Sequence, residues 1–151
     1  MAKIYSYTKY IDKDTSKVIE LPVDADNNPV GTELATINGV TYVSIPDTDT
    51  LPTKQHSKID ASIKPVVLTP ELKAAIKAES PHAKLISARI IEKIRDQYTV
   101  DHELYLARIG VGQQQGLYTP TASELKELAD FGAFVEGIRA WGNAERAKLG
   151  L

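Results

Sequence analysis

The chain has 151 residues, of which 42% are hydrophobic and 25% charged, a composition typical of a soluble globular protein rather than a disordered one. Eighteen basic and 20 acidic residues give a formal net charge of −2, so its charge gives no reason to expect binding to nucleic acid or to an anionic membrane surface. The absence of cysteine excludes disulfides, thiolate catalysis and sulfur-ligated metal sites.

The N-terminal run MAKIYSYTKYIDKDT interrupts each apolar stretch with charged residues. Neither a signal-peptide core nor an apolar segment of membrane-spanning length is found along the chain. We therefore expect synthesis and residence in a cytosol, unless an assembly carries the protein out, and we expect no membrane partner.

The first part of the chain is predicted to form a small antiparallel β-meander. KIYSYTKYI (3–11) alternates along its length, and SKVIELPV (16–23) is a short apolar run between Asp-rich turns. The strongest local signal is ELATINGVTYVSIP (33–46), in which two β-rich arms flank Asn38-Gly39. Both of these residues tolerate the positive φ of a type I′ turn, which predicts a hairpin.

A sheet of about 45 residues buries too little apolar surface to fold alone, so its cover must come from the C-terminal helices or from another subunit. The next segment, residues 47–68, begins with a polar, turn-rich run (47–64) that lacks a helical or strand period. We predict an extended linker there.

The rest of the chain is predicted to be helical. Thr69-Pro70-Glu71 combines a hydroxyl cap, a proline in the first turn and an acid near the positive end of a helix dipole, and Ser80-Pro81 repeats this start signal. The second helix carries a wide apolar stripe up to Tyr98. A short helix is predicted over 100–109, and the glycines of GVGQQQG (110–116) are expected to interrupt regular structure.

The last predicted helix is the longest. Thr121-Ala122-Ser123-Glu124 fits a capping box, and the helix can continue to Lys148 before Gly150 ends it. Glycine inside a helix costs roughly 1 kcal/mol relative to alanine. The interior glycines therefore predict close approach by another backbone or a local bend: Gly132, Gly137 and Gly142.

Together these elements predict an α+β fold, with a small N-terminal antiparallel β-meander and hairpin, a linker, and a C-terminal bundle of three to four helices. The predicted division is a β module at 1–46, an extended linker at 47–68 and a helical domain at 69–151.

The three histidines, His56, His82 and His102, lack the spacing of a zinc site. His102, between Asp101 and Glu103, has the neighbours of a polarised base, but an acid-flanked histidine at a helix start is more often an ordinary surface residue. We assign it no role.

Asp24-x-Asp26-x-Asn28 is similar to the start of a calcium loop, but Pro29 and Ala35 stand where glycine and a bidentate acid are required, which favours an Asx turn. GVGQQQG lacks the lysine and hydroxyl of a phosphate-binding loop. We therefore predict a protein that is not an enzyme, with no catalytic, cofactor-binding or metal-ligating residues and no cofactor.

Several side chains are candidates for contacts with a protein partner. The N-terminal tyrosines lie on a predicted edge strand that could pair with another chain, although an ordinary amphipathic strand is the alternative. Trp141, with Phe131 and Phe134, is either part of the hydrophobic core or an anchor in an interface, and the core is the favoured alternative. The candidate interface residues are Tyr5, Tyr7, Tyr42, Gln113, Gln114, Gln115 and Trp141.

The run GTELATINGVTYVSIPDTDTLP (31–52) places a hairpin between Gly31 and Pro46 and leads into a proline-bearing linker. With LISARIIEKIRDQYTVDHELYLARIG (85–110) in a helical C-terminal half, it resembles small proteins encoded in the tail modules of tailed bacteriophages.

The resemblance implies a virion component that joins tail and fibre parts through protein–protein contacts in an oligomeric context. Such a protein would be located in the virion tail after assembly in the host cytoplasm, without a nucleic-acid partner. One alternative is a tail-fibre assembly chaperone that stays in the host cytoplasm and is not retained in the virion. A second alternative is a small enzyme of unknown type, such as a hydrolase that uses His102 with a nearby acid.

Overall fold

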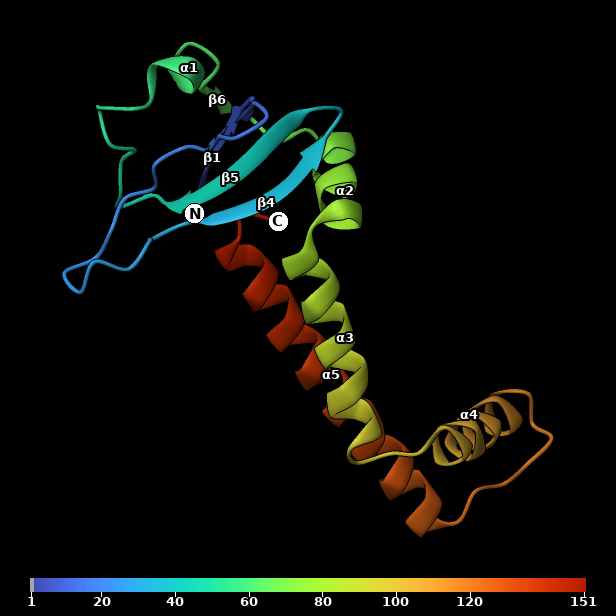
Figure 1. Ribbon diagram of the computed structural model, residues 1–151. Coiled ribbons are helices and arrows are strands. Elements are labelled where there is room, and N and C mark those ends of the chain that lie inside the picture. The colour runs from blue at the N-terminus through green and yellow to red at the C-terminus, as the bar shows by residue number, and fades with distance from the viewer. Residues whose placement is uncertain (1) are drawn as a thin grey trace. The chain divides into compact units, whose positions relative to one another are not determined.

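The computed structural model describes residues 2–151 and confirms the α+β class, with an antiparallel sheet followed by a helical region (Figure 1). The first half contains β1 (Ala2–Tyr7), β2 (Tyr10–Ile11), β3 (Ser16–Lys17), β4 (Thr32–Ile37), β5 (Val40–Pro46), α1 (Ser57–Asp60) and β6 (Lys64–Val66). The second half contains α2 (Pro70–Glu79), α3 (Pro81–Arg95), α4 (Val100–Gln114) and α5 (Ala122–Lys148).

The chain divides into two compact units. The first, which we call the sheet unit, comprises the residues up to 86 together with 144–151. The second, the helical unit, comprises 87–143. This division differs from the predicted division, because α2 and the C-terminal residues belong with the sheet. Whether the predicted boundaries mark separately folding domains stays a prediction.

The predicted hairpin is confirmed. β4 and β5 pair through a two-residue turn in which Asn38 and Gly39 have φ of 50° and 80°, as a type I′ turn requires. A register shift between Glu33 and Ala35 marks a β-bulge at Leu34. The side chain of Leu34 is completely buried.

The strand order differs from that of a meander. The four-stranded sheet has the order β4-β5-β1-β6, while β2 and β3 form a separate two-stranded ribbon. β1 pairs antiparallel with β5 on one side, where Tyr5 lies opposite Val43, and with β6 on the other. The prediction that the N-terminal strand lies at an edge was therefore wrong, because β6 supplies its second partner.

Both faces of the sheet are covered from within the sheet unit. On one face Ile4 and Leu34 pack with Ile76 of α2 and with Leu151. On the other face Tyr7 and Val43 pack with Ile59 of α1. Figure 1 shows α2 beside β4.

The segment predicted as an extended linker contributes to this core. Ile59 is completely buried, and Leu51 and Ile63 pack against the same cluster. These apolar residues are too widely and irregularly spaced to show a period, because α1 is only one turn long and β6 has three residues. Their role depends on long-range packing, which periodicity in the sequence does not report.

The predicted helix starts are confirmed at α2 and α3. The Thr69 hydroxyl accepts a hydrogen bond from the backbone N–H of Leu72 at 3.2 Å, and Pro70 occupies the first turn. Between the two helices the Ser80 hydroxyl accepts from the N–H of Ala83 at 3.4 Å. A side-chain acceptor at this position satisfies an N–H that the helix itself leaves unpaired.

α4 is longer than predicted. It passes through Gly110 and Gly112 and ends at Gln114, and Gly116, just after the C-cap residue, has a φ of 69°. The N–H groups of Gly116 and Leu117 donate to the carbonyls of Gln113 and Gly112, which is a Schellman C-cap. A Cβ added at Gly110 would lie 3.6 Å from Leu128 of α5, and one at Gly112 would lie 2.9 Å from Tyr118. Gly112 therefore permits the close approach of Tyr118, Gly110 makes an ordinary van der Waals contact, and neither glycine breaks the helix.

α5 has the predicted extent, and its capping box is confirmed. The N–H of Thr121 donates to the Glu124 carboxylate at 2.7 Å, and the N–H of Glu124 donates to the Thr121 hydroxyl at 3.2 Å. A Cβ added at Gly132 or Gly137 would meet no atom within 4 Å. The close approach of another backbone, which we predicted because glycine destabilises a helix, is therefore not observed at these two positions.

The helical unit has its own small core. Tyr98, Leu106 and Ile109 are buried, with Leu128, Phe131 and Phe134 of α5 packed against them. The Tyr98 ring meets the ring of Phe131 edge to face at 4.9 Å between centroids, a favoured aromatic geometry. Among residues 2–151, no helix is both long enough and apolar enough to cross a bilayer.

Candidate interaction surface

The three tyrosines predicted at an interface lie in or against the core of the sheet unit. Tyr7 is only 1% exposed, and its burial raises the pKa of its hydroxyl to about 12. It therefore presents no surface to a partner, which corrects the prediction made for it. Tyr5 and Tyr42 are partly buried against opposite clusters, and an interface role for them stays a prediction.

The three predicted glutamines lie in the last turn and at the C-cap of α4, where all three are exposed. Trp141 is partly exposed, and Lys93 lies over its ring at 5.0 Å from the centroid. A shallow groove of about 370 Å³ beside Trp141 is lined by charged residues of α3. The glutamines belong to the helical unit, and the three tyrosines belong to the sheet unit.

The Asp24 segment forms the predicted Asx turn. The Asp24 carboxylate accepts backbone N–H groups of Asp26 and Asn28, each at 2.9 Å. The bond from Asn28 is the main cause that lowers the pKa of Asp24. Within the described chain, no group of three or more His, Asp and Glu side chains is placed to hold a metal ion.

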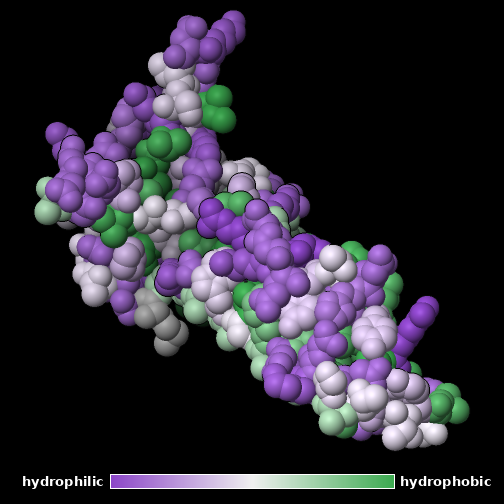
Figure 2. Space-filling view, turned by 90° about the horizontal axis from the view of Figure 1, so that it is seen from below, coloured by the Kyte–Doolittle hydropathy of each residue, from purple (hydrophilic) through white to green (hydrophobic). Residues whose placement is uncertain are grey.

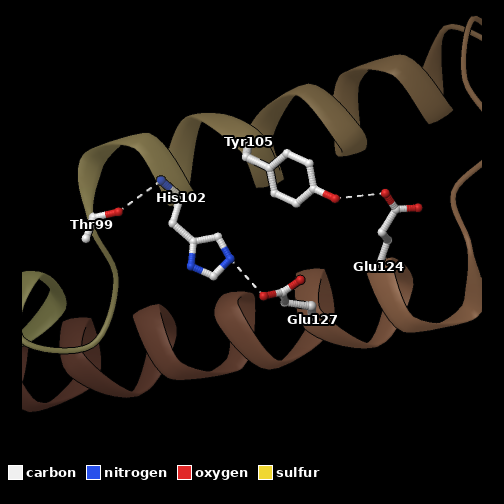
Figure 3. Close-up of polar contacts among 5 residues, drawn as sticks. All are labelled: Thr99, His102, Tyr105, Glu124 and Glu127. Carbon is white, nitrogen blue, oxygen red and sulfur yellow. Dashed lines mark hydrogen bonds and ion pairs between the residues drawn. The ribbon is translucent and has the colours of Figure 1, made fainter.

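His102 pairs with an acid on a different helix from the one its sequence neighbours suggested. Its Nε2 lies 2.7 Å from Oε1 of Glu127, so the pair joins α4 to α5 (Figure 3). The imidazole also packs against the rings of Tyr98 and Tyr105, at 5.5 and 6.3 Å between centroids. A histidine held by a carboxylate has the geometry of an oriented base, and it equally forms a clamp between two helices.

Next to this pair, Glu124 collects hydrogen bonds at the start of α5. Its carboxylate accepts from the Tyr105 hydroxyl at 2.9 Å (Figure 3). It also accepts from the Tyr118 hydroxyl at 2.9 Å and from the N–H of Thr121. These donors, the backbone N–H first, lower the pKa of Glu124 to about 2. The same bonds raise the pKa of both tyrosines, mainly through the side-chain bond to Glu124. The Tyr105 hydroxyl is thereby committed to Glu124 and not to His102.

The face of α4 that points away from this core is apolar and exposed. Val100, Leu104 and Val111 are 52%, 58% and 52% exposed, and they recur at helical spacing with Ala107 between them. We call these four residues the outer stripe of α4. The opposite side of the helix carries the buried Leu106 and Ile109. α4 is therefore apolar on two faces, and only one of them is covered.

A groove of about 410 Å³ lies along the outer stripe. Leu104, Val111 and Leu117 line it with Gln115, and Leu117 is 79% exposed. In Figure 2, hydrophobic residues reach the surface among hydrophilic ones. An apolar groove with a polar rim is typical of a surface that contacts another protein.

Two opposite charges lie on one flank of the outer stripe. Asp101 and Arg108 are both exposed and lie seven residues apart, which places them on the same side of the helix. Across residues 2–151, neither side chain takes part in an ion pair. Glu103, by contrast, is already paired with Arg95 of α3.

Reasoning from the sequence missed the outer stripe because it ended the helix at Ile109 and so separated Leu104 from Val111. The signal was present in the 4-3-4 spacing of Val100, Leu104, Ala107 and Val111. Of the predicted residues, Gln115 is the one that lines this groove. Compared with protein-family models, with curated proteins and with solved structures, the chain matches none of them.

Proposed function

We propose that this protein acts without catalysis, as an adaptor that contacts other proteins in the tail or tail-fibre region of a bacteriophage. The observation that carries the binding role is the outer stripe of α4, where three large apolar side chains are each more than half exposed beside a groove. The phage context rests on the resemblance of residues 31–52 and 85–110 to tail-module proteins.

The clamp between α4 and α5 supports this role, because it makes the stripe part of an ordered body. His102 and Glu127 join the two helices, and Tyr105 donates to Glu124 at a second point. A preformed surface loses less conformational freedom on binding than a loop does. The buried Leu106 and Ile109 hold the other side of α4 in place.

The sheet unit provides further exposed apolar side chains for a second contact. Val67, directly after the edge strand β6, is 91% exposed, and Ile11 of β2 is 74% exposed. Single exposed apolar residues are common on protein surfaces, so the sheet unit supports the proposal less strongly than α4 does. An adaptor requires at least two contact surfaces, and these residues provide candidates for the second.

Mass spectrometry of purified phage particles tests the virion form of the proposal. We expect the protein at a fixed copy number relative to the tail proteins. If mature particles lack it, the virion form is wrong. The assembly-chaperone alternative then predicts that tagged protein retains unassembled fibre protein from infected cells and loses it when the fibre matures.

A variant of the stripe tests whether α4 carries the binding. Leu104→Gln with Val111→Gln keeps good helix formers while removing the apolar surface, and we expect reduced retention of tail or fibre protein. Ile91→Gln is the matched control, since Ile91 is 59% exposed on α3. Equal retention by both variants would show that the stripe does not carry the function.

A further inference from the structure

The outer stripe has the spacing of a helix-pairing seam. The steps from Val100 to Leu104, Ala107 and Val111 are four, three and four residues, the alternation that keeps side chains on one line between two packed helices. A lone surface helix has no need for this second apolar line, because α4 already packs against α5 through Leu106 and Ile109. The seam therefore fits a second helix.

The charges beside the seam identify which helix it fits. An antiparallel helix that is related to α4 by a two-fold axis brings Leu104 against the partner's Ala107 and Val100 against the partner's Val111. In the same register Asp101 faces the partner's Arg108, and by symmetry Arg108 faces the partner's Asp101. Large residues meet small ones at the centre, and opposite charges meet twice on one flank.

We propose that α4 binds α4 of a second copy of this chain, antiparallel and around a two-fold axis. This rests on the proposed binding function of the outer stripe and names its partner. Self-complementarity is what a two-fold interface requires, because the same patch serves on both subunits. The unpaired Asp101 and Arg108 carry the argument for this partner, since they are already positioned for an isologous contact.

The exposed residues of the sheet unit then stay available for a different protein, so the dimer becomes a bivalent adaptor. Two linked copies bind a repeating partner more tightly than one copy does, by effective concentration. The dimer itself is weak, because one helix of 15 residues covers less area than a stable interface requires. We expect a dissociation constant on the order of 10 µM.

Analytical ultracentrifugation of the full chain between about 1 and 500 µM tests the dimer. We expect monomers at the low end and dimers at the high end. Arg108→Asp places two aspartates against each other and should raise the dissociation constant about tenfold. Arg89→Asp makes the same charge change on α3, where the residue is exposed, and should leave the constant unchanged.

The decisive variant is the double exchange Asp101→Arg with Arg108→Asp. It reverses both charges and restores two opposite-charge pairs, so the dissociation constant should return to within about threefold of the wild-type value. A purely structural role for either residue predicts no such rescue. Circular dichroism of each variant checks that the helices remain folded.

The results separate this inference from the proposed function. A chain that remains monomeric up to the highest concentration, or a dimer that both Arg108→Asp and the double exchange leave unchanged, overturns the α4 pairing. If that monomeric protein still retains tail or fibre protein, the adaptor function is supported and does not require the α4 pairing. A dimer that behaves as expected but binds no phage component would leave the pairing intact and remove the function.

Discussion

The sheet unit buries its apolar side chains more completely than the helical unit. Leu34, Ile45 and Ile59 of the sheet unit have no exposed surface, and apolar clusters cover both faces of the sheet. The helical unit centres on Tyr98, Leu106 and Ile109, while Leu104 and Val111 of α4 remain more than half exposed. Burial of apolar surface is the main favourable term in folding. The sheet unit thus covers both faces of its sheet and leaves single apolar residues such as Ile11 and Val67 exposed, whereas the helical unit leaves the outer stripe of α4 exposed.

The N-terminal β module was expected to borrow apolar cover from the helical domain (69–151) or from another subunit. That expectation is confirmed for one face of the sheet, which α2 and the C-terminal residues cover. The other face is covered by α1, from the segment predicted as a linker. The exposed apolar stripe lies on α4, in the part of the chain that was expected to supply the cover.

The largest expected effect separates the two apolar faces of α4. Leu106→Ala removes a completely buried side chain and should lower the free energy of unfolding of the helical unit by about 2–5 kcal/mol. Leu104→Ala is the matched control, and at monomer concentrations it should change stability by less than about 0.5 kcal/mol. Urea unfolding measures both values. Similar costs at the two positions would mean that the outer face is buried in solution.

Hydrogen exchange on Leu106→Ala sharpens the contrast between the units. We expect amides of α4 and of the paired part of α5 to lose protection, while β1 and β5 keep theirs, because their clusters do not include Leu106. Equal loss of protection in both units would contradict the separation into two cores.

Glycine substitutions give the next largest effect. Gly116→Ala places a side chain at a φ of 69°, which costs about 1–2 kcal/mol, and it weakens the C-cap of α4. Gly132→Ala adds a methyl group in open space on α5 and should stabilise the protein by up to about 1 kcal/mol. Thermal unfolding compares them. Destabilisation by Gly132→Ala would indicate that another molecule approaches this face.

The clamp between α4 and α5 should contribute less. His102 and Glu127 are 36% and 42% exposed, so solvent screens their interaction and we expect at most about 1 kcal/mol. A double-mutant cycle with His102→Gln and Glu127→Gln measures this coupling at neutral and at mildly acidic pH. A coupling well above that range would show a pair shielded by a partner or by self-association.

The smallest effect concerns the pH dependence of the start of α5. The pKa of Glu124 is lowered from 4.5 to about 2, so its ionised form stabilises the folded protein above pH 4.5, and this contribution is lost as the pH falls towards 2. Glu124→Gln retains a capping-box side chain without the charge. The stability difference between wild type and variant should therefore shrink between pH 4.5 and 2. A difference that is constant over this range would contradict the pKa shift.

Individual residues show which structural features the sequence patterns predict correctly. Asn38-Gly39 predicted the turn, and Thr69, Ser80 and Thr121 predicted three helix starts, all of which are confirmed. The interruption expected at Gly110 and Gly112 was wrong, because α4 continues through both glycines, and at Gly112 the neighbouring Tyr118 leaves no room for a Cβ. Propensity describes a residue alone and cannot include such a neighbour.

The candidate surface was less predictable than the fold. The sequence shows the helical spacing of Val100, Leu104 and Val111, but this spacing does not indicate which apolar face of α4 is covered by α5. His102 lies between Asp101 and Glu103 in the sequence, but it pairs with Glu127, 25 positions further along the chain. Sequence neighbours of a helical residue point to other sides of the helix, so they are poor guides to its partners.

The sequence by itself determined the hairpin turn and the helix caps, because these depend on hydrogen bonds among residues within about five positions of one another. It also determined the class of fold, because the apolar periodicity of each segment indicates a strand or a helix. The tertiary structure alone decided that β1 lies between β5 and β6, that α1 and its flanking residues complete the core, and that the outer stripe of α4 stays uncovered. Each of these depends on which apolar surfaces remain after distant segments have packed. Local sequence patterns do not determine which distant segments pack together, so these features are defined only in the folded protein.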